Sequence, residues 1–421
     1  MLTQHHILWD GWSTPLIVTE LLDRYTALVA GDRTPAGLEA PLPAFRSYLE
    51  WLGRQDRDRA LAAWRQALSG LTAPTLLAGA DPHRMQTLPQ RLSVELPAGT
   101  TARLTEVTRA HGLTLSAVVQ GAWAILLGRS TGSDDVVFGQ VVSGRTPELE
   151  GVENMVGLFI NTLPVRFRLR SEETLTAALG RFQAEQAVLM DHQHVSLSDV
   201  QEAAGLGTLF DTVVAFENYP LDEARLRGGD GDGPRITGAR ATDATHYSVN
   251  LVVHPGPRLR FDLDHRPEVL DREAAGRLAD ALRDLLTAVA EEPSSLVGST
   301  GSAEVSAPSG APRPRNGDDA PFEPPATETE ELIAAVWADV LEVSEVGRRS
   351  NFFLSGGQSL KAMRVAARLR EALNLELPLR LVFEHPTVAQ LAVAVEAALA
   401  EEAIAAAAAP AGAHTTLGDL Q

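Results

Sequence analysis

The stretch NFFLSGGQSLKAMRVAARLR, residues 351–370, places a serine between a glycine pair and a helical pattern. The glycines bring the chain close around Ser359, and apolar residues recur at helical spacing from Leu360 to Leu369. We therefore expect Ser359 at the start of a helix. A serine in that position is most often an N-cap that satisfies free backbone amides. Its hydroxyl at the positive end of a helix dipole also suits a phosphodiester, whose negative charge that end stabilises.

The helical pattern continues on both sides of this serine and predicts a small all-α module of four helices, residues 327–400. The expected helices cover residues 330–341, 359–373, 379–383 and 387–400. The alanine-rich residues 401–421 are low in complexity, so we expect this tail to fray, with a helical docking tail as the alternative.

A linker is expected between this module and a larger body. Residues 291–326 contain 17 Pro, Gly or Ser among 36 residues and lack hydrophobic periodicity, which predicts a flexible tether. In the body, strand-like and amphipathic helical segments alternate, which favours an α/β or α+β fold. A Pro-, Gly- and Ala-rich segment, residues 71–90, predicts a division into a front piece, 1–85, and a second lobe, 86–290. Strands are expected at 4–9, 136–142, 162–169, 211–216, 247–254 and 258–264, and helices at 13–30, 56–69, 115–128, 175–190 and 271–290.

Composition excludes several classes of function. Hydrophobic residues make up 44% of the 421 residues, enough to bury a substantial core. A formal net charge of −19 argues against nucleic acid or an anionic membrane as a partner. The chain has no cysteine, so thiolate chemistry must come from a cofactor. Without a signal peptide or a membrane-spanning apolar run, the sequence predicts a cytoplasmic protein.

A second motif stands near the N-terminus, in HHILWDGWS, residues 5–13. It contains His5, His6, Asp10 and Gly11 in the order HHxxxDG. Adjacent histidines on the expected strand point to opposite faces, so they do not readily chelate one metal, and only one can face a cleft. From the residues alone, a hydrogen-bonded structural histidine and a catalytic one both remain open.

The C-terminal module resembles peptidyl carrier domains. Three blocks carry the resemblance, PATETEELIAAVWADVLEV, NFFLSGGQSL and PLRLVFEHPTVAQLAVAVE, in the order and spacing of that family. Gln358 stands where a histidine is usual, and Ser355 replaces a common leucine. The resemblance implies that a phosphopantetheinyl transferase attaches phosphopantetheine from coenzyme A to Ser359. The thiol of that arm supplies what the cysteine-free chain lacks.

Residues 1–290 resemble condensation domains of nonribosomal peptide synthetases, relatives of chloramphenicol acetyltransferase. Besides HHILWDGWS, the blocks that match are PAFRSYLEW, VVSGR, MVGLFINTLPVR, HQHVSLSDV and LFDTVVAFENYP. The resemblance implies a chloramphenicol acetyltransferase-like lobe with a mixed sheet and helices. HHILWDGWS and GLFINTLPVR look closest to the subtype whose donor peptide ends in a D-residue.

The implied chemistry is attack of an acceptor α-amine on a donor thioester carbonyl, which forms an amide. An α-amine with a pKa of about 8 must lose a proton before or during attack. By resemblance, His6 accepts that proton or orients the amine, and Asp10 holds the loop by ion pairing. Gly11 is expected to keep the channel open for the arm. We expect His192 and His194 to be structural.

Two parts of a usual synthetase module are absent from the resemblance. Most of the first condensation lobe is missing, so we expect a fragment or a second chain that supplies it. No adenylation domain lies between the body and the carrier, so loading is expected in trans, and the donor comes from an upstream carrier domain. The alternatives are a non-catalytic carrier or docking protein with a residual lobe, and a free-standing acyltransferase that uses coenzyme A thioesters. A serine hydrolase is disfavoured, because Ser359 lacks a G-x-S-x-G elbow.

Overall fold

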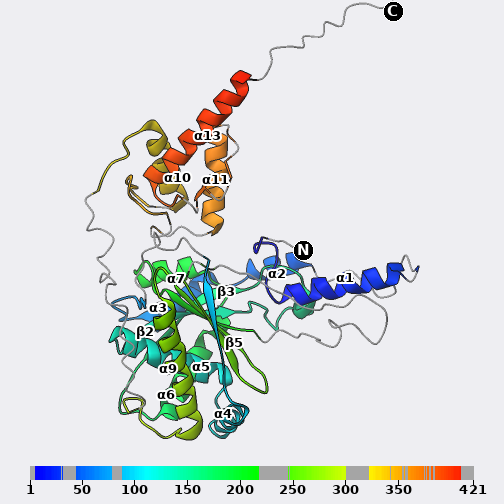
Figure 1. Cartoon of the computed structure of the whole chain (residues 1–421), viewed down its shortest axis with the longest axis vertical. Helices are drawn as coiled ribbons and strands as arrows, with labels where there is room; N and C mark the ends of the chain where they lie inside the picture. The colour runs from blue at the N-terminus through cyan, green and yellow to red at the C-terminus, as the bar shows by residue number, and fades with distance from the viewer. Residues whose placement is uncertain are drawn as a thin grey trace, which may run out of the picture. The chain divides into compact units, whose positions relative to one another are not determined.

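The computed structural model describes two compact units, which we call the larger unit, residues 5–299, and the helical unit, residues 322–408 (Figure 1). The described residues are 5–29, 31, 44–77, 88–217, 245, 247–299, 322–341, 343–352, 355, 359–373, 375, 377–378, 381–382 and 385–408, without the side chains of residues 359, 360, 363 and 401–408.

A six-stranded mixed sheet with the strand order β1-β6-β5-β4-β2-β3 forms the centre of the larger unit. Strand β4 pairs in parallel with β2 and β5, and the remaining neighbours are antiparallel. The strands are β1 (Gln90–Glu95), β2 (Asp135–Val142), β3 (Asn161–Arg168), β4 (Thr212–Phe216), β5 (Val249–His254) and β6 (Arg260–His265). The strand-like segments of the sequence predicted β2 to β6 to within about two residues, whereas β1 was not predicted.

Helices cover both faces of this sheet. The expected helices correspond to α1 (Ser13–Val29), α3 (Arg57–Leu68), α5 (Leu115–Thr131), α6 (Leu175–Leu189) and α9 (Arg272–Glu291). Three more helices were not predicted, α2 (Phe45–Leu52), α4 (Ala98–Ala110) and α7 (Leu197–Ala204), together with the short 3-10 turns η2 (Val152–Asn154) and η3 (Met190–His192).

Strand periodicity sorts the apolar residues into two cores. Phe138 of β2 and Val214 of β4 pack with α4, α5, α6 and α9 on one face. Their neighbours Val137 and Val213 pack with α3 and α7 on the other face. Side chains that alternate along a strand point to opposite faces, so one apolar run serves both cores. The predicted mixed sheet with helices is confirmed.

The described part of the predicted front piece packs against this sheet. Trp64 of α3 shares a core with Val213 of β4, and Thr75 Oγ1 accepts the backbone N–H of Val137 at 2.8 Å. The boundary predicted near residue 85 therefore does not separate two compact units. The assignment of these residues to a first lobe stays a prediction.

The strand predicted over residues 4–9 is wrong for residues 5–9, which form a turn. The backbone N–H of Leu8 donates to the carbonyl of His5 at 3.0 Å. A strand needs a neighbour to satisfy its backbone groups, and this segment pairs with no described strand. The argument that the two histidines lie on opposite faces of a strand therefore does not apply.

The helical unit has its own hydrophobic core, in which Trp337 and Phe352 meet with ring centroids 5.1 Å apart. Its helices are α10 (Glu328–Leu341), α11 (Ser359–Leu373) and α13 (Val388–Ala408). Of the short helix predicted at 379–383, only Leu381 and Val382 are described, and both are helical. The predicted all-α carrier-like module is confirmed.

The linker predicted at 291–326 begins too early. Residues 292–299 pack against the larger unit, where the N–H of Leu175 donates to the carbonyl of Ser295 at 2.9 Å and Val297 is buried. At the other end, the N–H of Arg348 donates to the carbonyl of Glu323 at 2.9 Å, so residue 323 belongs to the helical unit. Residues 300–321, on which the rest of this prediction falls, lie outside the described residues.

The tail predicted to fray from residue 401 begins as helix, because α13 continues to Ala408. Alanine has the highest intrinsic helix propensity, which explains why this low-complexity run extends the helix. Residues 409–421 lie outside the described residues.

Among the described residues, no single helix is long and apolar enough to cross a membrane. One bent pair, α4 with α5, meets the criteria of length and composition when the two helices are taken together.

Candidate functional site

Asp10 of the histidine motif is completely buried and accepts hydrogen bonds from three directions. Its Oδ1 accepts the backbone N–H of Ser13 at 3.0 Å and the Ser13 hydroxyl at 2.9 Å. Its Oδ2 accepts the backbone N–H of Phe159 at 3.0 Å, and Arg145 donates to Oδ1 at 3.2 Å. Because Ser13 begins α1, the carboxylate both caps that helix and ties it to the loop between β2 and β3.

Arg145 is the cation that balances this buried carboxylate. It follows β2 and donates to the carbonyls of Val152 and Met155 as well as to Asp10. Its guanidinium lies 4.0 Å above the ring centre of Phe159. Burial lowers the pKa of Arg145, an effect that the Asp10 carboxylate opposes, and arginine remains protonated at neutral pH. The expectation that Asp10 acts by ion pairing is supported by this contact.

Two glycines allow this close packing. Gly144 has a φ of 64°, and a Cβ there would lie 1.9 Å from the carbonyl oxygen of Phe159. A Cβ on Gly157 would lie 2.2 Å from the ring of Phe45. Both positions therefore require glycine, because a side chain would push the loop away from the motif. The blocks VVSGR and MVGLF contain them, but their spacing alone does not reveal which neighbour excludes a side chain.

Aromatic side chains of α2 cover the other side of the loop. Tyr48 packs on Phe159 with ring centroids 4.6 Å apart and stacks on Trp51 at 5.8 Å. Burial raises the pKa of the Tyr48 phenol, and the nearby Asp10 carboxylate adds to the rise. The side of the loop that faces α2 is therefore packed with aromatic rings.

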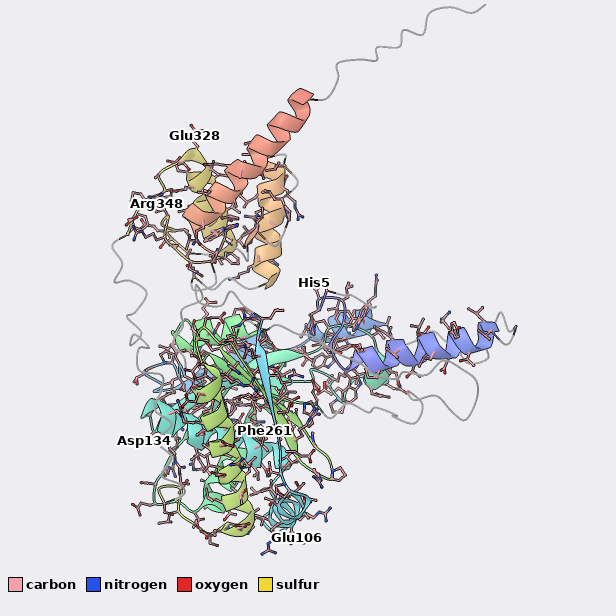
Figure 2. The ribbon with its side chains drawn as sticks, in the orientation of Figure 1. His5, Glu106, Asp134, Phe261, Glu328 and Arg348 are labelled. Atoms are coloured by element: carbon pink, nitrogen blue, oxygen red, sulfur yellow. The ribbon has the colours of Figure 1, made fainter. Side chains whose placement is uncertain are left out.

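The two histidines lie on the turn before Asp10, and both are exposed. Figure 2 labels His5. His5 turns back on its own backbone, where its Nδ1 accepts the N–H of Ile7 at 3.2 Å. His6 makes no hydrogen bond with any described residue. The structure thus brings Asp10, Gly11 and the histidines together on one segment, but the described residues place His6 on an open surface.

The remaining motif residues have different surroundings. Gly11 is half-buried in the turn that leads into α1. The carbonyl of His192 accepts the indole N–H of Trp64 at 2.8 Å, and His194 meets Trp51 edge to face at 6.3 Å. These contacts join η3 and the following loop to α3 and α2, and the structural role of the two imidazoles stays a prediction.

Ser359 is the first residue of α11, as predicted. The first turn of this helix contains no acidic residue. A phosphate group attached there would meet the positive end of the helix dipole without a neighbouring carboxylate in that turn. The chemistry of this position therefore fits a phosphopantetheine ester on a serine hydroxyl.

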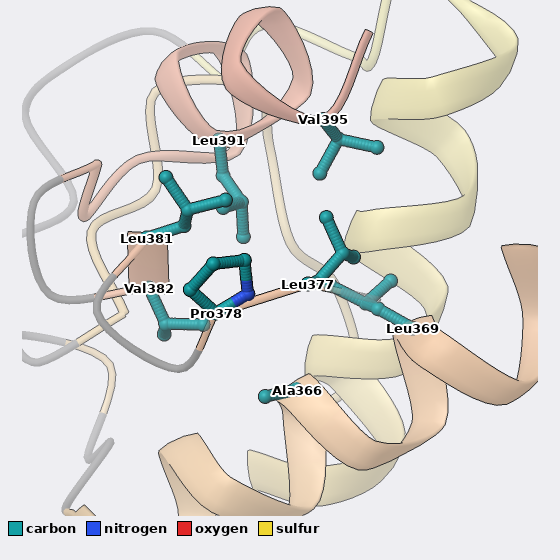
Figure 3. A pocket seen from close by; sticks show the side chains of 8 residues that line it. All are labelled: Ala366, Leu369, Leu377, Pro378, Leu381, Val382, Leu391 and Val395. Carbon is teal, nitrogen blue, oxygen red and sulfur yellow. The ribbon is translucent and has the colours of Figure 1, made fainter. Parts of the chain in front are cut away.

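An apolar hollow lies among the described residues of the helical unit, but it is small (Figure 3). Its volume of about 10 Å³ has room for no more than one water molecule. An acyl group on the arm therefore does not fit inside it. The lining residues are Ala366, Leu369, Leu377, Pro378, Leu381, Val382, Leu391 and Val395.

In the part of the chain that the structure describes, no group of three or more histidine, aspartate or glutamate side chains could hold a metal ion.

Comparison with solved structures agrees with the observed fold. The X-domain from teicoplanin biosynthesis superposes with a TM-score of 0.60 at 23% identity, over 70% of this chain and 70% of that domain. The first condensation domain of the calcium-dependent antibiotic synthetase gives a TM-score of 0.58 at 22% identity, over 70% of this chain and 65% of that domain.

Among curated sequences, the chain is similar to parts of two large synthases. The chain is 39% identical over 297 residues to chondramide synthase cmdD of Chondromyces crocatus and 36% identical over 269 residues to bacitracin synthase 3 of Bacillus licheniformis. The matches cover 69% and 62% of this chain but only 7% and 4% of the respective synthase. The chain therefore spans a small part of the length of these relatives.

Family models match both units of the chain. Residues 1–304 match the family described as Condensation domain, and residues 331–395 match the one described as Phosphopantetheine attachment site. Domains of the second kind carry a covalently attached phosphopantetheine. The chain therefore belongs to the condensation domain family of nonribosomal peptide synthetases, with a phosphopantetheine carrier domain following on the same polypeptide.

Proposed function

We propose that the chain forms amide bonds in nonribosomal peptide synthesis, between a donor peptidyl or aminoacyl thioester and an acceptor aminoacyl thioester. The observation that carries this proposal is the anchored histidine motif, with Asp10 buried against Arg145 and His6 presented on the adjoining turn. A carrier domain on the same chain supports it, because such a domain holds the acyl groups that a condensation domain joins.

The attachment site in this proposal is Ser359. Its place at the start of α11 and the lack of an acidic residue in the first turn support a phosphodiester there. When bound, phosphopantetheine supplies the thiol that holds an acyl group as a thioester. The hollow of the helical unit cannot enclose the acyl group, so we expect the arm to hold this group outside the hollow.

His6 is the residue proposed to meet the acceptor amine. An α-amine is mostly protonated at neutral pH, so a neutral imidazole can accept its proton or orient it for attack. His5 already accepts a backbone N–H, which leaves His6 as the histidine open to a substrate. Asp10 fixes the turn without reacting, and Gly11 leaves room for the arm.

A complete cleft requires surface from elsewhere. On the histidine segment and α1, six large apolar side chains are exposed, each by at least two fifths of its surface: Ile7, Leu8, Leu21, Tyr25, Leu28 and Val29. Contiguous exposed apolar residues mark surfaces that another polypeptide segment covers. We propose a first condensation lobe as that segment, whether or not it belongs to the same polypeptide.

The proposed partners follow from the same chemistry. A phosphopantetheinyl transferase attaches the arm, an adenylation domain acting in trans loads it, and an upstream carrier domain presents the donor. The stretches HHILWDGWS and GLFINTLPVR resemble those of the subtype whose donor peptide ends in a D-residue, which supports a donor of this kind.

The alternative is a non-catalytic carrier and docking protein whose condensation lobe is a scaffold. The open surface around His6 favours this reading, because catalysis by positioning needs both walls of a cleft. Misplacing reacting groups by about 1 Å can cost on the order of a hundredfold in rate.

One experiment separates these functions. The arm is attached with a broad phosphopantetheinyl transferase, Ser359 is aminoacylated, and a peptidyl donor carrier is added, with and without a first-lobe polypeptide. Intact-protein mass spectrometry is expected to show one arm, absent in Ser359→Ala. Amide product is expected only when the lobe is present, and it should be lost in His6→Ala but retained in the matched variant His5→Ala. An arm on another residue, or no product with the lobe present, contradicts the proposal.

A further inference from the structure

The loop between β2 and β3 carries concentrated negative charge next to the histidine segment. Residues 146–154, TPELEGVEN, contain three glutamates and no lysine or arginine. Glu148, Glu150 and Glu153 are all exposed, and we call them the acidic loop. None of them forms an ion pair with any residue that the structure describes.

The acidic loop is held in place rather than free to swing away. The carboxylate of Glu148 accepts the indole N–H of Trp51 at 2.9 Å, and the carbonyl of Glu153 accepts that of Trp12 at 3.0 Å. Between them, Val152 is buried in the aromatic cluster, and its carbonyl accepts a hydrogen bond from Arg145. The backbone of the acidic loop is therefore tied to Trp12, which belongs to the histidine segment, and the carboxylate of Glu148 is tied to Trp51 of α2.

The carrier helix of this chain shows the opposite charge. Lys361, Arg364 and Arg368 follow one another at spacings of three and four residues, so they share one face of α11. Arg364 and Arg368 are exposed, Lys361 is half-buried, and we call the three the basic stripe. Arg368 also forms an ion pair with Asp339 of α10. The other face of α11 is buried in the core of the helical unit. The net charge of the chain is −19, so a cluster of three cations is a local exception to its acidic composition. Lys361 is also the single lysine of the chain.

We propose that the acidic loop is a docking surface for a carrier domain that presents cations along the helix beginning at its attachment serine. The inference rests on the proposed function, since the arm on such a serine must bring its thioester to His6. A carrier that approaches with this helix first places positive charge opposite three exposed carboxylates. Complementary charge raises the rate of encounter and selects the orientation, over a screening length of about 8 to 10 Å at physiological salt.

Two full-length variants of the chain test this inference without any condensation reaction. In the first, Ser359 receives a fluorescent arm from a coenzyme A derivative, and its own acidic loop is neutralised by Glu148→Gln, Glu150→Gln and Glu153→Gln. The second variant carries Ser359→Ala, so it cannot be labelled, and it is titrated into the first. Fluorescence anisotropy then reports binding of the labelled carrier to the acidic loop of the other copy.

We expect neutralisation of the acidic loop in the titrated copy to weaken binding about tenfold at low salt, and the difference to shrink as salt is raised. A matched control changes net charge equally on α9, by Glu273→Gln, Asp280→Asn and Asp284→Asn, and should leave binding unchanged. Reversing charge on both sides, Glu148→Arg and Glu150→Arg against Lys361→Glu and Arg364→Glu, should restore binding.

The outcomes separate the two proposals. Equal binding with intact and neutralised loops, or an equal effect of the α9 control, overturns the docking inference and leaves the function in place. Failure of Ser359 to take the fluorescent arm contradicts the attachment site, and the docking inference falls with it.

Discussion

The two candidate reactive residues, His6 and Ser359, differ in how much of their surroundings the chain provides. Ser359 begins a helix whose described apolar residues pack into the hydrophobic core of the helical unit. His6 stands on an exposed turn that is anchored through one buried residue, Asp10. Attachment of an arm needs an accessible hydroxyl on a folded module, whereas condensation needs two thioesters held against each other. A sequence motif therefore predicts a working site only where the same folded unit also supplies the surroundings that the reaction needs.

Removal of the Asp10 carboxylate, which anchors the histidine segment, is expected to have the largest effect on stability. In Asp10→Ala the buried guanidinium of Arg145 loses its carboxylate, and breaking a buried pair in this way costs about 3 to 5 kcal/mol. We expect the turn and α1 to detach, seen as faster hydrogen exchange of residues 10–29 by mass spectrometry, while α10 and α11 keep their protection.

A double variant shows whether this cost comes from the stranded charge. Asp10→Ala combined with Arg145→Met removes both charges, so its segment should be better protected than in the single variant. If the two variants exchange equally fast, the ion pair does not account for the anchoring.

The packing of the loop gives a smaller effect. In Gly157→Ala the new methyl group meets the ring of Phe45 at 2.2 Å, and overpacking of this kind costs about 1 to 3 kcal/mol. We expect a lower urea midpoint for the larger unit, followed by fluorescence. Gly99→Ala on α4 is the matched control, because nothing lies within 4 Å of its Cβ, and it should be neutral or slightly stabilising. A midpoint unchanged in Gly157→Ala would show that α2 yields without cost.

Much of the fold follows from patterns that act within one segment. Phe138 and Val137 alternate between two cores, so β2 was predictable from its own residues. The strand β1 was missed because only one face is apolar and its ladder with β6 joins residues far apart in sequence. The turn at His5 was mistaken for a strand, because a short apolar run carries no information about whether a neighbouring strand exists.

The candidate site shows the same division. Ser359 was placed correctly because a glycine pair and a helical pattern are local signals. The ion pair of Asp10 was expected, but its partner Arg145 was not, since the two are 135 positions apart. The only signal in the sequence for the contact between Asp10 and Arg145 was that the HHxxxDG and VVSGR blocks both occur in the same family. The need for glycine at 144 arises from the backbone of Phe159, which no local pattern reveals.

The smallest effect is expected in the helical unit, for a substitution of Glu330. Glu330 is buried, accepts from Arg348 at 2.9 Å and from the N–H of Ala326 at 2.7 Å, and so joins the start of α10 to the loop after it. The hydrogen bond from Arg348 lowers the pKa of Glu330 below its usual value. A carboxyl whose pKa is lowered by folding stabilises the unit above the unfolded value, near 4.3, and this contribution is lost as the pH falls through the folded value.

In Glu330→Gln the amide keeps one acceptor but loses the charge, so we expect a loss of about 1 kcal/mol in the free energy of unfolding at neutral pH. Hydrogen exchange of α10 and α11, compared with the unsubstituted chain at each pH, should show this loss at pH 7 and its progressive decrease as the pH falls below the unfolded value through the folded value. Glu331→Gln, on the exposed face of the same helix, should give no difference at either pH. A difference between Glu330→Gln and the unsubstituted chain that stays constant with pH would mean that packing, not the charge, links these segments.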